Sequence, residues 1–309
     1  MRKNSLIAAM LSVALASFAY GQSNANGIGY FALEVPANVT ITIDGDDGDW
    51  AWFDPIFTVG PDEMYEIQKA EVLDKSDLDV AIMTAWTGTD RDNRLYGFVR
   101  ATDDTLVVTS DVFDDGWRDD DLEIITDANA SGGPHDGDGE SGTRAEGQQF
   151  TMHLPVPGVY ETPYGGDGSW WLRWQVVEEI HWMDEFAESR VTTNPPGATT
   201  GSTNVTVNYE YSIPLWDYAS LDGADNSIRH ENEAGQIIRL TYQLNEADNP
   251  EDRRTHQLAT TGEDGASGNC DVCSEYTLLG ADEYERADGG EGTAVESKSW
   301  AKIKATFSD

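Results

Sequence analysis

The sequence predicts an all-β chain, folded as an antiparallel β-sandwich of the jelly-roll or immunoglobulin-like kind. Apolar and polar residues alternate in many short runs, most clearly in 204–213, where every odd-numbered residue is apolar. Such alternation is typical of strands with one buried face. Clusters of glycine and aspartate, such as 44–48 and 114–116, separate the runs and are typical of turns. Helical periodicity is scarce, so the alternating strands and helices of an α/β fold are not expected.

The strands expected from this alternation follow one another along most of the chain. In order, they are 79–86, 94–101, 170–176, 204–213 and 300–307. Two stretches, 131–147 and 245–295, are polar and rich in glycine, and they predict long acidic loops. Strand patterns continue on both sides of the first stretch, and no internal repeat is present. We therefore expect a single β-sandwich domain over 22–309.

The first residues have the pattern of a secretory signal peptide. Arg2 and Lys3 precede an apolar run over 6–19 that is too short to span a bilayer, and small residues follow it. We expect a signal peptide over 1–21 and a protein secreted to the periplasm or the extracellular space. No later window has the length and hydropathy of a membrane-spanning helix, so no membrane contact is expected.

The chain is strongly acidic, with 57 Asp and Glu against 19 Lys and Arg and a formal net charge of −38. Such a charge repels nucleic acids and anionic glycans, so neither is an expected partner. It has two interpretations, which are compatible with each other. The carboxylates solvate the protein in a salty medium, or some of them bind Ca²⁺, which prefers oxygen ligands.

Both cysteines of the chain lie in the sequence Cys270-Asp-Val-Cys273. A disulfide is the expected state in an exported protein. Because the loop that it closes is short, a small stabilisation is expected. A redox site would need a βαβ context, and a c-type haem site would need histidine where Ser274 stands.

An ordered series of short motifs resembles one known family. The motifs are 41–45 with Trp50, 95–99, 103–104, 117–124, 213–216 and 243–248. In this order and spacing they are similar to the family 9 carbohydrate-binding modules, and the resemblance covers about residues 39 to 307. It implies a β-sandwich that binds a neutral polysaccharide or oligosaccharide and catalyses no reaction.

The resemblance also implies site residues. In the family, a tryptophan six residues before a glutamate forms one wall of the sugar site, and the glutamate accepts hydrogen bonds from hydroxyls; Trp117 and Glu123 match this spacing. A glutamine that begins a Gln-x-Asn-x-Ala pattern also contacts sugar, and Gln243 matches it. Both roles suit sugars, because pyranose rings stack on indole and their hydroxyls need fixed donors and acceptors. On strands, Glu123 and Gln243 lie between apolar neighbours and are expected to face away from the core.

The chain departs from the family at two positions. No tryptophan stands between Trp216 and Trp300, where the family has a second sugar-stacking tryptophan, and Thr151 stands where the family has an arginine. Trp171 is a candidate for the second stacking residue, because on a strand it shares a face with polar side chains. The alternative for Trp171 is packing in the core or in an interface.

A structural Ca²⁺ ion is the expected cofactor. Asp103 matches a family position near bound calcium, and Asp104 follows it. Two further acidic clusters, 44–49 and 136–140, are alternatives, although neither is an EF-hand.

Other functions are less well supported. The sequence contains no Gly-x-Ser-x-Gly elbow, no His-Glu-x-x-His helix and no phosphate loop, so a non-catalytic protein is predicted. The main alternative is an extracellular structural or surface protein that uses the same sandwich without a sugar and self-associates. A b-type haem domain, with ligands such as Met83, Met152 and His153, is a further alternative, but adjacent strand residues point to opposite faces.

Overall fold

The computed structural model describes residues 24–68, 74–109, 113–133, 146–154, 181–220, 222–251 and 254–284. The expected signal peptide and the expected strands at 170–176 and 300–307 lie outside these residues. The strands are β1 (Tyr30–Glu34), β2 (Tyr65–Glu66), β3 (Leu78–Trp86), β4 (Leu95–Thr105), β5 (Asp121–Asp127), β6 (Gln148–His153), β7 (Glu188–Asn194), β8 (Thr203–Ile213), β9 (Trp216–Tyr218), β10 (Ile228–Arg229), β11 (Ile237–Glu246), β12 (His256–Ala259) and β13 (Glu275–Leu279).

Helical structure is short within the described residues. The 3₁₀ helices are η1 (Ala25–Gly27), η2 (Gly48–Trp50), η3 (Pro55–Phe57), η4 (Pro61–Glu63), η5 (Phe113–Arg118), η6 (His181–Phe186), η7 (Ala224–Asn226) and η8 (Cys270–Val272), and one α-helical turn is α2 (Ala281–Tyr284). No helix in the described part of the chain has the length and hydropathy needed to cross a membrane.

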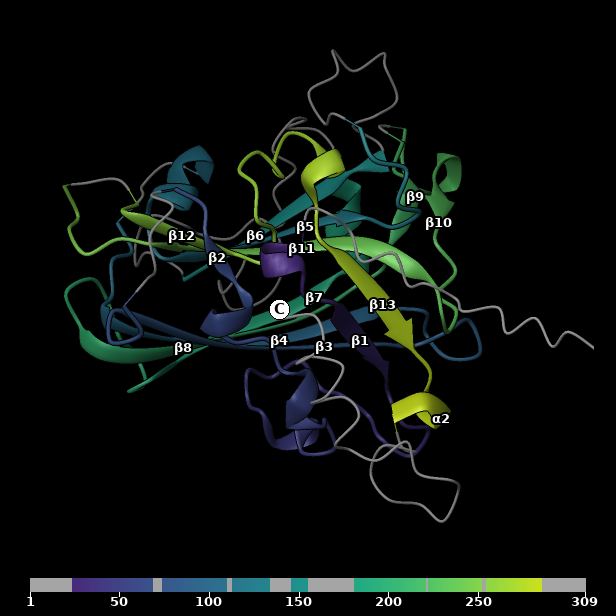
Figure 1. Ribbon diagram of the computed structural model, residues 1–309, viewed down its shortest axis with the longest axis horizontal. Coiled ribbons are helices and arrows are strands. Elements are labelled where there is room, and N and C mark those ends of the chain that lie inside the picture. Colours follow the sequence, from purple (N-terminus) through teal and green to yellow (C-terminus); the bar gives the residue numbers. More distant parts are fainter. Residues whose placement is uncertain are drawn as a thin grey trace, which may run out of the picture.

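The strands form a sandwich. Along one hydrogen-bonded path the order is β2-β12-β11-β13-β1-β3-β4-β8-β7, while β5 pairs with β11 and β6. Figure 1 shows β3, β4 and β8 in one layer and β5, β6, β11 and β12 in the other. The predicted all-β sandwich is therefore confirmed. The sequence did not predict that β1 pairs in parallel with both β13 and β3, because pairing direction depends on contacts between distant segments.

The main core lies between the two layers and follows from the alternation seen in the sequence. In β8 every odd-numbered residue from Val205 to Ile213 is buried, including Tyr209 and Tyr211. The hydroxyl of Tyr211 lies 2.6 Å from that of Tyr242 on β11, which lies 2.9 Å from Thr84 Oγ1 on β3. The polar atoms of these buried side chains are thus satisfied within the core, as buried polar groups usually are.

A second apolar cluster covers the other face of β3 and β4, so β4 is buried on both faces near its start. Its members include Leu33, Trp50 and Phe98. Figure 1 shows the segment around η2 and η3 beside β3 and β4, on the side away from the other layer.

The 41–45 motif and Trp50 have a structural role in this cluster. Glu210, which is fully buried on β8, accepts hydrogen bonds from Trp50 Nε1 at 2.8 Å and from the backbone N–H of Gly45 at 2.8 Å and of Asp44 at 2.9 Å. Gly45 has φ of 79°, and a Cβ there would lie 2.5 Å from Thr192 Cγ2. The Asp-Gly pair therefore forms the tight turn that caps a buried carboxylate.

The expected disulfide is present. Cys270 and Cys273 are joined across η8, with their Cα atoms 4.5 Å apart. Both cysteines are buried against Ile125 and Ala266. The disulfide thus lies on the side of β5 that faces away from the main core.

Candidate functional site

The candidate site lies on the face of β5 and β11 that points away from the main core, called the outer face below. Residues of these strands that pack in the main core include Leu122, Ile124, Tyr242 and Leu244. Because successive strand residues point to opposite faces, Glu123 and Gln243 lie on the outer face, as the sequence predicts. Gln243 is directly opposite Glu123, and Asn245 is directly opposite Asp121.

Two rows of side chains cross the outer face from strand to strand. The Asp121 row consists of His153, Asp121, Asn245 and Gln257, in the order β6, β5, β11 and β12. The Glu123 row consists of Thr151, Glu123, Gln243, Ala259 and, on β2, Tyr65. Neighbouring strands lie about 5 Å apart, so each row brings its side chains within reach of one ligand.

Hydrogen bonds connect the two rows. Asn245 Nδ2 donates to Asp121 Oδ1 at 2.5 Å. Gln257 Nε2 lies 2.9 Å from Asn245 Oδ1 and 3.2 Å from Glu123 Oε2, and Arg254 Nη1 donates to Asn245 Oδ1 at 2.8 Å. These bonds fix the positions of Asp121, Glu123 and Asn245 before any ligand binds.

Trp117 lies at the edge of these rows. It belongs to η5, is half-buried, and has the guanidinium carbons of Arg254 and Arg118 at 5.0 Å and 5.3 Å from its ring centroid. Because Arg254 also bonds Asn245, it connects the indole to the Asp121 row. The sequence predicts an exposed tryptophan, whereas the structure shows a partly covered ring in cation–π contact.

The η5 segment also approaches the Asp121 row from the side of β6. His153 Nε2 lies 3.5 Å from Asp119 Oδ2, and a Cβ at Gly116 would lie 3.6 Å from the ring of His153. The loop that carries Trp117 is therefore placed against the outer face.

Three acceptor atoms on the outer face have no hydrogen-bond partner within the part of the chain that the structure describes. They are Asp121 Oδ2, Gln149 Oε1 and Gln243 Oε1. The side chains of Asp121 and Gln243 are only 1% and 2% exposed. A buried polar atom without a partner costs about 1–3 kcal/mol, so such a cluster is typical of a site that a ligand completes.

The pKa of Asp121 is raised in the folded protein. Burial, followed by the negative charge of Glu123, raises the pKa of Asp121 well above its ordinary value, while Asn245 and Arg254 oppose the shift. A protonated Asp121 carboxyl can donate a hydrogen bond as well as accept one. Asp121 and Glu123 thus offer two different kinds of hydrogen-bonding group to a hydroxyl-rich ligand.

The structure brings together three of the four residues that the sequence predicts for sugar binding. Trp117, Glu123 and Gln243 lie on or beside the outer face, while Trp171 lies outside the described residues and stays a prediction. Thr151, which stands where the family has an arginine, lies opposite Glu123. The guanidinium group near Trp117 comes instead from Arg254, on another segment.

Residues of the outer face that were not predicted from the sequence include Asp121, Asn245, Arg254 and Gln257. The period of two could have identified Asp121 and Asn245, each two residues from a predicted site residue. No local signal identifies Arg254 or Gln257, because they reach the site through the pairing of β12 with β11.

The two predicted calcium residues have different environments. Asp103 is buried, accepts a hydrogen bond from the N–H of Thr105 at 2.8 Å, and is hydrogen-bonded to Asp120; burial raises the pKa of Asp103 to about 6. Asp104 is exposed, and one of its oxygens lies within 4.8 Å of oxygens of Asp77 and Asp248. Asp104 is therefore better placed than Asp103 to bind a cation.

The carboxylates of the 44–49 cluster are engaged in their own turns. Asp44 Oδ1 accepts from the N–H of Asp46, Asp46 Oδ1 accepts from that of Gly48, and Asp49 Oδ2 accepts from that of Thr42. These bonds shape a loop, so the cluster offers no preformed metal site.

In the haem alternative, the adjacent pair Met152 and His153 does not converge. Met152 packs in the main core, whereas His153 lies on the outer face. Adjacent residues on opposite faces of β6 cannot hold one haem iron between them.

Comparison with known proteins gives structural similarity only. No protein-family model matches the chain, and no curated protein matches it. A family 9 carbohydrate-binding module from Caldicellulosiruptor kristjanssonii in complex with cellotriose is similar with a TM-score of 0.49 and 15% identity, over 87% of this chain and 98% of that one. Such a module from the same organism in complex with glucose is similar with a TM-score of 0.48 and 17% identity, over 85% of this chain and 98% of that one.

Proposed function

We propose that this protein is an exported, non-catalytic carbohydrate-binding protein and that a neutral sugar binds on the outer face of β5 and β11. The observation that carries the proposal is the pair of buried acceptors Asp121 Oδ2 and Gln243 Oε1, which have no hydrogen-bond partner among the described residues. Sugar hydroxyls supply the donors that these atoms need. The half-buried indole of Trp117 lies at the edge of the same rows, where Arg254 connects it to Asn245.

Each group on the outer face has a role in this proposal. The Glu123 carboxylate, Gln243 Oε1 and Asp121 Oδ2 accept hydrogen bonds from hydroxyls, and the Asp121 carboxyl can also donate one when it is protonated. Because Asn245 and Gln257 already hold Asp121 and Glu123, little ordering is needed when the sugar binds. The charge of −38 favours neutral over anionic sugars.

Two aromatic side chains flank the polar groups and supply the apolar contact. Trp117 offers its ring once the sugar replaces a guanidinium group over the indole, and Arg254 can keep its bond to Asn245 while it shifts. Tyr65, which is 37% exposed, ends the Glu123 row on β2. We propose that Tyr65 contacts a second sugar unit.

Calcium in this proposal is a structural ion. Asp77, Asp104 and Asp248 each offer an oxygen within 4.8 Å of the others, which fits the oxygen ligands that Ca²⁺ prefers. The ion would neutralise carboxylates that follow β11 and precede β3, and so hold these turns together.

Isothermal titration of the mature protein with glucose, cellobiose, cellotriose and xylo-oligosaccharides in calcium tests the proposal. We expect binding that is lost in Trp117→Ala and kept in Tyr218→Ala, a control that removes a half-exposed aromatic ring from β9. Circular dichroism checks that both variants are folded. No heat from well-folded protein with any sugar would favour the structural alternative, and self-assembly visible by microscopy would support that alternative.

A further inference from the structure

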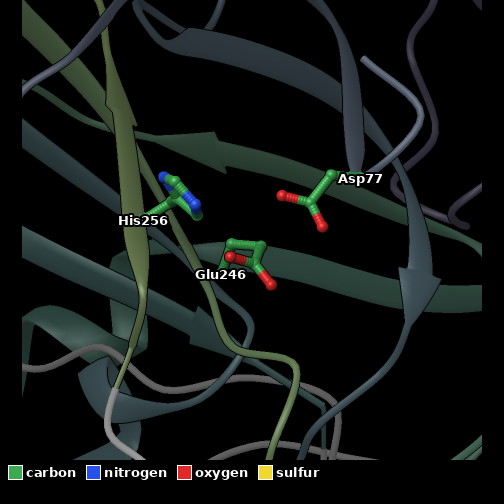
Figure 2. A group of neighbouring side chains, drawn as sticks. All are labelled: Asp77, Glu246 and His256. Atoms are coloured by element: carbon green, nitrogen blue, oxygen red, sulfur yellow. The ribbon is translucent and has the colours of Figure 1, made fainter. Parts of the chain in front are cut away.

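A second group of side chains, on the core side of the sheet, has the ligands of a metal site that includes a nitrogen. Asp77 precedes β3, Glu246 ends β11 and His256 begins β12. Figure 2 shows the two carboxyl groups and the imidazole facing one another. One ligand atom from each lies within 4.8 Å of the others.

The backbone places two of these ligands before any ion binds. Glu246 and His256 are directly opposite each other on antiparallel strands, so their side chains project from the same face. Their neighbours Asn245 and Gln257 point to the outer face, so this group and the sugar site lie on opposite faces of β11.

Glu246 offers one ligand oxygen to the group and also has a buried oxygen without a hydrogen-bond partner among the described residues. Its side chain is 1% exposed, and its Oε2 accepts a hydrogen bond from Thr255 Oγ1 at 2.7 Å. Its Oε1 has no hydrogen-bond partner among the residues that the structure describes. A coordinated cation would satisfy this oxygen, which otherwise carries the cost of desolvation.

The charges around the group also favour a cation, because the carboxylates of Asp77, Asp248 and Asp103 lie near Glu246.

A further carboxylate lies beside the imidazole. Glu66 Oε1 is 3.8 Å from His256 Nδ1 and is itself held by the backbone N–H groups of Gln68 at 3.0 Å and Gln257 at 3.1 Å. A carboxylate next to a metal-binding histidine orients the ring and raises its basicity.

We propose that Asp77, Glu246 and His256 bind a divalent transition-metal ion of the Zn²⁺ type. Imidazole nitrogen suits zinc and its neighbours in the periodic table, whereas Ca²⁺ takes oxygen ligands. Three protein ligands with nitrogen and oxygen donors leave a fourth position for water, a coordination that zinc accepts. The proposal is independent of sugar binding, because the two sites use different residues.

The test is titration of chelator-treated, dialysed protein with Zn²⁺ without added Ca²⁺, because Asp77 also belongs to the proposed calcium site. We expect one Zn²⁺ per chain. His256→Gln should lower the Zn²⁺ affinity by about tenfold or more, as disturbing a metal site commonly does. The matched control Asp225→Asn removes an exposed carboxylate of η7 and should leave the affinity unchanged.

A second variant distinguishes the loss of a metal ligand from a folding defect. Asp77→Asn changes a half-buried side chain in a turn, and it should also weaken Zn²⁺ binding while thermal melting of the chelated protein stays similar. Equal Zn²⁺ affinity in His256→Gln, Asp77→Asn and the wild type would overturn the proposal. Zn²⁺ binding that Asp104→Asn weakens as much as His256→Gln does would also overturn it, because it would indicate binding to the carboxylate group alone.

Discussion

Gln243 on β11 lies directly opposite Glu123 on β5, and both side chains are buried on the outer face of the sheet. Glu123 receives a hydrogen bond from Gln257, whereas Gln243 Oε1 has no partner within the described residues. A glutamine that stabilised the fold alone would be expected to have its oxygen satisfied. The unsatisfied oxygen of Gln243 therefore indicates a role in ligand binding rather than in stabilising the fold.

Gln243→Met should weaken sugar binding without lowering stability. Methionine has a similar volume and carries no buried acceptor, so the cost of the unsatisfied Oε1 disappears. The lost hydrogen bond to a sugar hydroxyl, worth about 0.5–1.5 kcal/mol, corresponds to a loss of up to about tenfold in affinity. Isothermal titration and urea unfolding measure the two effects. A variant that unfolds more readily and binds sugar normally would assign Gln243 a structural role.

Tyr65→Ala should weaken binding of cellotriose more than binding of glucose. Tyr65 ends the Glu123 row two strands away from Gln243, so only a longer ligand is expected to reach it. Tyr65→Phe retains the ring and is the matched control, with an affinity close to that of the wild type. An equal loss for both sugars would place Tyr65 at the first sugar unit instead.

Asp121→Asn should change how stability depends on pH. The pKa of Asp121 is raised in the folded protein, mainly by burial and then by Glu123, above the ordinary value of 3.8. The folded state therefore holds a proton that the unfolded state loses, so the contribution of Asp121 to stability is fully present below pH 3.8 and is lost as the pH rises through the folded pKa.

Asparagine cannot ionise, so the variant should gain stability relative to the wild type between about pH 5 and about pH 8. Its Oδ1 can still accept the hydrogen bond from Asn245. Urea unfolding of both proteins at the two pH values measures the difference. A difference that is the same at both values would show that the pKa of Asp121 is ordinary.

Much of the fold could be predicted from the sequence because the alternation of apolar and polar residues is a local property. It identified the buried face of β8 and the outward direction of Glu123 and Gln243, since each depends only on the neighbours in the same strand. The disulfide was equally predictable because Cys270 and Cys273 are three residues apart.

The tertiary structure alone decided which of these residues meet. Arg254 and Gln257 reach Trp117 and Glu123 because β12 pairs with β11 in one register. Strand register is set by the packing of whole layers, and a shift of one residue would move every side chain to the other face. The sequence by itself determined an acidic β-sandwich with a candidate sugar site, because these features depend on local patterns. The tertiary structure brought His256 beside Asp77 and Glu246, because contacts between distant segments depend on how the strands pair.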